Sequence, residues 1–266
     1  MINCKICKSK LIEKIFEYKK KPVKETIYLN IDYKKYSRTF YKCLKCKHFS
    51  SYLKMNVKNL YSSNYNQAIY FGKLKKNLIK INSLPNTKSD NYYRVKRIDD
   101  FLKKKILKKK NFKILDIGSG LGIFPYKMKK KNYNIIALDP DRKSCLHIKN
   151  NLKIKSIHGD FLKKKIKNKY NMITLNKVIE HVPNPEKMLN KVTKILSKDG
   201  LVYIEVPDIR ASKQGKNREE FHIDHLHVFS KKSLSFLIKK VKLKTKILKS
   251  IEEPSGKFSI FGIFKK

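Results

Sequence analysis

Four of the five cysteines lie in two pairs with the spacing Cys-x-x-Cys. The first pair is Cys4 and Cys7, the second is Cys43 and Cys46, and 35 residues separate the pairs. Two such knuckles can bring four thiolates into a tetrahedron, which suits zinc and stabilises a small subdomain with little core of its own. Two disulfides would require an oxidising compartment, and chance rarely doubles this spacing. We therefore predict a structural zinc site resembling a zinc ribbon, with iron as the alternative metal. Cys145 stands alone on a predicted helix, and we interpret it as a small buried residue rather than a nucleophile.

A second group of residues surrounds a glycine-rich turn. An apolar run over 114–117 leads into Gly118-Ser119-Gly120-Leu121-Gly122, and Asp139 follows Gly118 by 21 residues. The run reads as a buried strand, and the glycines let the backbone turn sharply and approach a ligand closely. Asp139 can accept hydrogen bonds from both hydroxyls of a ribose, as the equivalent carboxylate does in dinucleotide folds. The third glycine comes one residue earlier than in the Gly-x-Gly-x-x-Gly pattern, which disfavours NAD and leaves another nucleotide-type cofactor.

A third group combines histidines with carboxylates. Glu180 and His181 follow one predicted strand, and His222, Asp224 and His225 follow the next. Because open α/β sheets bind ligands beyond the carboxyl ends of their strands, we expect these side chains near the cofactor. Three roles are open: structural hydrogen bonding, general-base catalysis by His181 or His225 with Asp224 or Glu180 as the orienting group, or a divalent metal held by Glu180, His181 and His222 or His225.

The elements that must position these groups alternate between strand and helix from residue 112 onward, as a doubly wound sheet requires. Five apolar segments predict parallel strands, at 113–117, 134–138, 154–158, 171–175 and 200–206. A helix of apolar spacing over 186–196, closed by Asp199-Gly200, separates the last two strands. The predicted class is therefore an α/β fold with a largely parallel sheet.

Two further elements follow the last parallel strand. Ser230 can cap a helix over 231–241. The segments 244–251 and 257–264 flank Pro254-Ser255-Gly256, which predicts an antiparallel hairpin.

The first part of the chain is organised differently. Residues 1–55 are predicted to form the metal-binding subdomain, with short strands at 26–29 and 38–41. Residues 56–93 form a connector rich in Tyr and Asn, and apolar residues between 92 and 102 predict an amphipathic helix that leads into the first parallel strand.

Residues 94–266 resemble the class I methyltransferases that depend on S-adenosylmethionine (SAM). Four segments carry the resemblance in the family's order: LDIGSGLG, ALDPD, HGDF and NKVIEHVPNPEKML. The resemblance implies a Rossmann-like sheet of five parallel strands plus a C-terminal antiparallel hairpin, with SAM as the cofactor. It also implies that the cofactor is bound by Asp116, Gly118, Gly120, Gly122, Asp139, Asp160 and Asn176.

The resemblance further assigns a place to each of these residues. The glycines would approach the ribose and methionine portions of SAM, and Asp116 would orient the methionine ammonium. Asp160 would contact the adenine amino group, although a solvent-exposed loop acid is the alternative interpretation. Asn176 would lie beside the activated methyl group.

The combination of paired Cys-x-x-Cys, aromatic connector, SAM domain and acidic-His element resembles the zinc-containing sugar C-methyltransferases and their relatives in surface-glycan clusters. In that family a Tyr-x-Glu-His element and a preceding histidine serve the active site. The matching residues here are His222, Asp224 and His225, with His181 as the counterpart of the preceding histidine. Tyr is thus replaced by His and Glu by Asp, and the sequence ends with the predicted hairpin, without that family's C-terminal sugar-binding domain. The resemblance implies these four residues as catalytic, and a nucleotide-linked sugar or other small polar molecule as the acceptor, at carbon or oxygen.

The composition bears on partners. The formal net charge is +44, yet only six of the 65 basic residues are Arg, the side chain best suited to phosphate and base edges. Lysine is spread along the chain together with Ile and Asn, as an AT-rich coding sequence produces, so we favour compositional bias over a dedicated nucleic-acid surface. An RNA methyltransferase is the alternative enzyme, although the segment 176–179 lacks an Asn-Pro-Pro-Tyr type of motif. A non-catalytic binding module with the same fold is a second alternative.

No apolar run approaches the roughly 20 residues that span a bilayer, and the N-terminus lacks a secretory signal. We therefore expect a cytoplasmic protein without a membrane span. The sequence leaves the oligomeric state and the acceptor atom open.

Overall fold

The computed structural model describes residues 2–28, 32–54, 74–103 and 111–266. Much of the predicted connector, including all of 56–73, lies outside the described residues.

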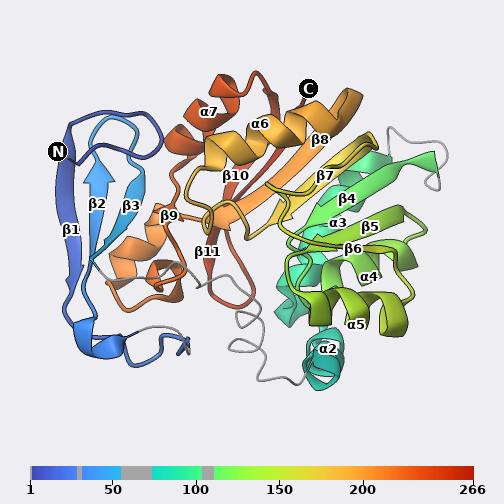
Figure 1. Cartoon of the computed structure of the whole chain (residues 1–266), viewed down its shortest axis with the longest axis horizontal. Coiled ribbons are helices and arrows are strands. Elements are labelled where there is room, and N and C mark those ends of the chain that lie inside the picture. Colours follow the sequence, from blue (N-terminus) through green and yellow to red (C-terminus); the bar gives the residue numbers. More distant parts are fainter. Residues whose placement is uncertain (1, 29–31, 55–73, 104–110) are drawn as a thin grey trace.

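The main sheet combines parallel strands with a C-terminal hairpin, as predicted (Figure 1). Its strand order is β10-β11-β8-β7-β4-β5-β6. The strands are β4 Lys113–Ile117, β5 Asn134–Asp139, β6 Ser156–His158, β7 Tyr170–Asn176, β8 Leu196–Pro207, β10 Lys244–Glu252 and β11 Phe258–Lys265. Strands β8, β7, β4, β5 and β6 pair in parallel, and β11 pairs antiparallel with both β8 and β10. The predicted fold class is confirmed.

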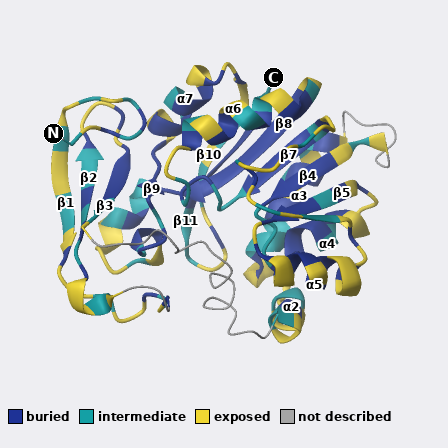
Figure 2. Ribbon diagram, in the orientation of Figure 1, coloured by how far each residue is buried: buried dark blue, intermediate teal, exposed yellow. Residues whose placement is uncertain are grey.

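Helices cover both faces of this sheet, as a parallel sheet requires. They are α2 Leu74–Asn82, α3 Asp90–Lys103, α4 Ile123–Lys130, α5 Arg142–Leu152, α6 Pro185–Ile195 and α7 Lys231–Lys240. Side chains alternate along each strand, so Ile114 and Met172 pack with α3 and α4, whereas Leu115 and Ile173 pack with α6 and α7. The buried strands therefore lie between helices whose outer faces are exposed (Figure 2). Within the described residues, every helix is too short or too polar to cross a membrane.

Two predicted strand boundaries and one predicted strand were wrong. Residues 154 and 155 are not part of β6, because this edge strand pairs with β5 over only three positions. The last parallel strand, predicted over 200–206, begins at Leu196, directly after α6 ends at Ile195, so Asp199-Gly200 lies within β8. Residues 26–28 form no strand.

A smaller sheet at the N-terminus has the order β1-β2-β3-β9. Its strands are β1 Ile12–Tyr18, β2 Arg38–Cys43, β3 Phe49–Leu53 and β9 His227–Val228. Strand β9 comes from the far end of the chain and pairs antiparallel with β3, beside the main sheet (Figure 1). The aromatic core of the small sheet likewise includes Phe221 and Val228, which are fully buried. The N-terminal unit is therefore built partly from the segment that carries the candidate histidines.

Candidate active site

A cavity of about 650 Å³ opens at the carboxyl ends of β4, β5, β7 and β8. Its lining includes nine of the eleven predicted cofactor and catalytic residues: Asp116, Gly118, Gly120, Asp139, Asp160, Asn176, His181, Asp224 and His225. Gly122 and His222 are not among the lining residues. The structure thus gathers into one space side chains that lie more than a hundred residues apart in sequence.

The glycine turn has the conformation that its sequence predicts. Gly118 has a φ of 72°, and a Cβ atom there would lie 2.7 Å from Cγ2 of Val178. Gly122 serves packing instead, because a Cβ atom at this position would lie 2.7 Å from side-chain atoms of both Ile148 and Leu152 on α5. The first glycine therefore shapes the cavity edge, whereas the third permits close approach of two helices.

Asp139 links the glycine turn to the end of β5. Its Oδ2 accepts a hydrogen bond from the backbone N–H of Gly120 at 2.8 Å, and its Oδ1 accepts one from the N–H of Asp141 at 2.9 Å. Each oxygen of an ionised carboxylate can accept more than one hydrogen bond. Asp139 can therefore hold the turn and still receive ribose hydroxyls from the cavity.

Asp116 lies at the end of β4 and is 2% exposed. It accepts hydrogen bonds from Oγ1 of Thr174 at 2.6 Å and Nδ2 of Asn176 at 2.9 Å. Burial raises the pKa of Asp116 to about 6, against the effect of these donors. Oδ1 of Asn176 is buried without a hydrogen-bond partner among the described residues. This carboxyl and amide fit a ligand that brings its own hydrogen-bond donors, such as an ammonium group.

The raised pKa of Asp116 predicts a stability cost at neutral pH. The carboxyl titrates near 3.8 when unfolded and at about 6 when folded, so the stability it contributes is complete below pH 4 and is lost as the pH rises through 6. Asp116→Asn keeps the accepting oxygen without the charge. We expect its free energy of unfolding to match the wild type at pH 4 and to exceed it by about 2–3 kcal/mol at pH 7.5. Urea denaturation at both pH values checks this, and a difference that does not change with pH would contradict it.

The opposite wall of the cavity carries the histidines. Nδ1 of His181 lies 2.8 Å from the backbone oxygen of Asp224, and Nδ1 of His225 lies 2.9 Å from that of Glu220. The two rings are 4.9 Å apart. Burial lowers the pKa of His225 to about 4 despite the attraction of Asp224, so this ring is neutral at physiological pH. Burial also raises the pKa of Glu180, which lies behind the wall.

The small N-terminal sheet supports this wall. The backbone N–H groups of Leu226 and His227 donate to the backbone oxygen of Glu180 at 2.9 and 3.2 Å. His227 is in turn bonded through Nδ1 to Nε2 of buried His48 at 3.0 Å. Tyr28 lies close enough to Asp224 for the negative charge of this carboxylate to add to the effect of burial, which raises the pKa of Tyr28. The contributions of Tyr28 and His48 were not predicted, since these contacts join distant segments and leave no local pattern.

Three basic side chains that were not predicted also line the cavity, namely Arg94, Lys177 and Lys257. Arg94 forms an ion pair with Glu205, and Lys257 lies 3.1 Å from Glu219. Because lysine occurs in nearly every segment of the sequence, no local signal distinguishes these cavity-lining basic residues from the basic residues at the surface.

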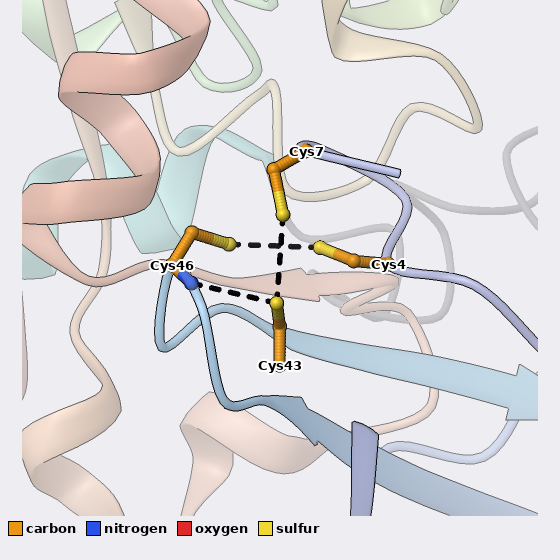
Figure 3. A group of neighbouring side chains, drawn as sticks. All are labelled: Cys4, Cys7, Cys43 and Cys46. Atoms are coloured by element: carbon orange, nitrogen blue, oxygen red, sulfur yellow. Dashed lines mark hydrogen bonds between the residues drawn. The ribbon is translucent and has the colours of Figure 1, made fainter. Parts of the chain in front are cut away.

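The four paired cysteines converge at the edge of the small sheet (Figure 3). Sγ of Cys4 lies 3.6 Å from that of Cys46, and Sγ of Cys7 lies 3.5 Å from that of Cys43. Four thiolates around one zinc ion at about 2.3 Å would be about 3.8 Å apart, so the group fits a tetrahedral site. The backbone N–H of Cys46 also points at Sγ of Cys43 at 3.4 Å, as in an outer shell that orients a ligand.

The two knuckles share one backbone geometry. Lys8 and Lys47 each follow the second cysteine of a pair, with φ values of 63° and 60°. Their N–H groups donate to the backbone oxygens of Cys4 and Cys43 at 3.0 and 2.8 Å. Cys145 is separate and buried, and burial raises the pKa of its thiol to about 11, which agrees with the prediction that it is not a nucleophile.

This chain is similar to known methyltransferases both in sequence and in structure. The ubiquinone biosynthesis O-methyltransferase of Pelagibacter ubique (strain HTCC1062) is 31% identical over 102 residues, which are 36% of this chain and only 42% of that enzyme. The magnesium protoporphyrin IX methyltransferase of Synechocystis PCC 6803, solved with S-adenosylhomocysteine, superimposes with a TM-score of 0.61 at 8% identity, over 77% of this chain and 97% of that one. A possible histamine N-methyltransferase of Thermotoga maritima gives 0.55 at 16% identity, over 76% and 98%. At these identities the two structures show a shared fold.

The family assignment comes from the sequence of the domain that builds the cavity. Residues 89–245, more than half of the chain, match the family model described as a methyltransferase domain. The chain therefore belongs to this methyltransferase family, and the fold of the matched region is that of the class I SAM-dependent enzymes.

Proposed function

We propose that the protein transfers the methyl group of SAM to a small polar acceptor, in the first place a nucleotide-linked sugar or a glycan precursor, at carbon or oxygen. The observation that carries this proposal is that the glycine turn and Asp139 line the same cavity as His181, Asp224 and His225. One half suits a nucleoside and the other half offers polar groups to a second molecule.

The cofactor half would hold SAM through the residues already described. Asp139 would receive the ribose hydroxyls, Asp116 and Asn176 the ammonium group, and Asp160 the adenine. SAM brings an activated methyl group on a sulfonium, so the protein needs mainly to align the acceptor with it. The backbone of Gly118 and Gly120, which carries no side chain into the cavity, permits this close approach.

The acceptor half supports a polar and compact substrate. His181, Asp224, Lys177 and Lys257 line it, together with Phe258, and a cavity of about 650 Å³ must hold cofactor and acceptor together. Lysine side chains favour an acceptor that carries negative charge. The choice of a sugar rests on the resemblance of the sequence to sugar C-methyltransferases.

The arginines give little support to an RNA substrate. Five of the six pair with carboxylates of the same chain: Arg38 with Glu25, Arg94 and Arg97 with Glu205, Arg210 with Asp208, and Arg218 with Glu220. Arginines engaged in this way offer few donors to phosphate groups.

The test is to incubate the protein with SAM labelled in the methyl group and with separate pools of nucleotide sugars and total RNA. Label in the nucleotide-sugar pool is expected. Label in RNA alone would replace the sugar with the alternative substrate, and absence of SAM binding by calorimetry would contradict both enzymes.

Once an acceptor is found, His225→Ala tests whether the acceptor half of the cavity acts in catalysis independently of SAM binding. The ring faces the acceptor side, so we expect SAM affinity within about twofold of the wild type and a kcat lower by about 100-fold or more. Calorimetry and initial rates measure the two effects. An equal loss of SAM binding would mean that His225 only supports the wall.

A further inference from the structure

Glu180 is the most unusual buried group near the cavity. Its side chain is completely buried, and neither carboxylate oxygen has a hydrogen-bond partner among the described residues. No lysine or arginine of the described chain lies within ion-pair distance of it, and its nearest partner is Nε2 of His181 at 4.0 Å. Burying a carboxylate without a partner is costly, so buried charges in proteins are paired or coordinate a metal.

The neighbouring histidines are held as metal ligands usually are. Nδ1 of His181 and Nδ1 of His225 each face a backbone oxygen, which can only accept a hydrogen bond. Each Nδ1 must therefore carry the proton, and in the neutral ring the lone pair is on Nε2. Metal-binding histidines typically donate their second ring N–H to a carbonyl or carboxylate, which fixes the tautomer and the orientation of the ring.

The three side chains converge. Ligand atoms of Glu180, His181 and His225 all lie within 4.8 Å of one another. Around one ion with bonds of about 2.0–2.2 Å, the ligand atoms of a tetrahedral site are about 3.3–3.6 Å apart. Side-chain rotations that shorten the longest of these separations by about 1 Å would close the group around an ion.

Of the three roles that the sequence left open, the geometry points to the metal: we propose that Glu180, His181 and His225 bind one first-row divalent cation, with open coordination positions toward the acceptor half of the cavity. Two imidazoles and one carboxylate suit Mn²⁺, Fe²⁺, Co²⁺ or Zn²⁺. The site differs in chemistry from the four cysteines, whose thiolates favour softer ions. His222, which does not line the cavity, is not a ligand.

The role of the ion rests on the proposed function, whereas its binding does not. His181 and His225 line the cavity and Glu180 lies behind them, so the open positions would receive oxygen atoms of the acceptor. A cation at this place would counter negative charge that develops on such an oxygen. It would also give the fully buried Glu180 carboxylate the positive partner it lacks.

The test uses the protein with any metal at its cysteines left in place, titrated with Mn²⁺, which prefers oxygen and nitrogen ligands to thiolates. The fall of the free Mn²⁺ signal in electron paramagnetic resonance reports binding. We expect one Mn²⁺ per wild-type chain and an affinity about tenfold or more lower in Glu180→Gln and in His225→Gln. Glu219→Gln is the matched control, because Glu219 lines the same cavity but is not part of the cluster; it should bind as the wild type does.

Three results would overturn the proposal: no Mn²⁺ binding by the wild type at millimolar concentration, unchanged binding by a folded Glu180→Gln, or equal loss in Glu219→Gln. If the variants do not fold, Mn²⁺ must still broaden the imidazole resonances of His225 in the wild type, and a failure to do so rejects the site. SAM binding by calorimetry is independent of these outcomes, so a failed metal site and a failed proposed function are distinguishable.

Discussion

Asp139→Ala is expected to weaken SAM binding by about 100-fold or more. An ionised carboxylate that accepts two ribose hydroxyls contributes about 1.5–3 kcal/mol per hydrogen bond, and each 1.4 kcal/mol is a factor of ten in affinity. The same side chain holds the N–H of Gly120 at 2.8 Å, so its loss also loosens the glycine turn. Isothermal calorimetry with SAM measures the effect directly.

Asp208→Asn is the matched control for this experiment. Asp208 is also a buried acid directly after a strand, and it caps the following turn through the N–H of Arg210, but it does not line the cavity. The control should bind SAM as the wild type does. If both variants lose affinity equally, the effect of Asp139 is on stability and the proposed ribose contact is wrong.

Cys43→Ser is expected to abolish binding of the predicted structural metal and to destabilise the chain most strongly at its N-terminal sheet. Structural zinc sites of four thiolates contribute directly to folding free energy. We expect about one zinc per wild-type chain by elemental analysis, none in the variant, and a loss of about 3–5 kcal/mol, which lowers Tm by about 10 °C. Iron in the wild type would correct the metal but not the site.

Cys145→Ser controls for the loss of a thiol as such. Cys145 is buried in α5, far from the cluster in sequence, and is not among the grouped cysteines. It should keep the full metal content. Retention of metal by Cys43→Ser, or equal loss by Cys145→Ser, would contradict the assignment.

Because β9 pairs with β3, the effect of Cys43→Ser should reach the cavity wall that carries His181 and His225. Ser50 of β3 pairs with His227 of β9, whose N–H donates to the oxygen of Glu180. We expect the imidazole resonances of His181 and His225 to shift in Cys43→Ser and to stay in place in Cys145→Ser.

The sequence alone determined the architecture of the main sheet and one half of the site. A strand buried on both faces must be apolar, and the turn after β4 requires glycine where φ is positive. Both constraints can therefore be recognised in the local amino-acid sequence. The convergence of the four paired cysteines was likewise predicted from their spacing, which is typical of a metal knuckle. The start of β8 was predicted wrongly, because Asp199-Gly200 is typical of a helix end. In the structure α6 ends at Ile195, and both residues lie within β8.

Only the tertiary structure decided how the two units are joined and which acceptor-side groups meet. The two residues of β9 are too short a strand to be recognised locally, yet they join the small sheet and hold Glu180 in place. The approach of Tyr28 to Asp224 and the burial of Glu180 behind His181 depend on packing between segments far apart in the chain. Local sequence encodes backbone conformation and spacing, whereas the partners and desolvation of a buried charge are set by whichever distant segments the fold brings beside it.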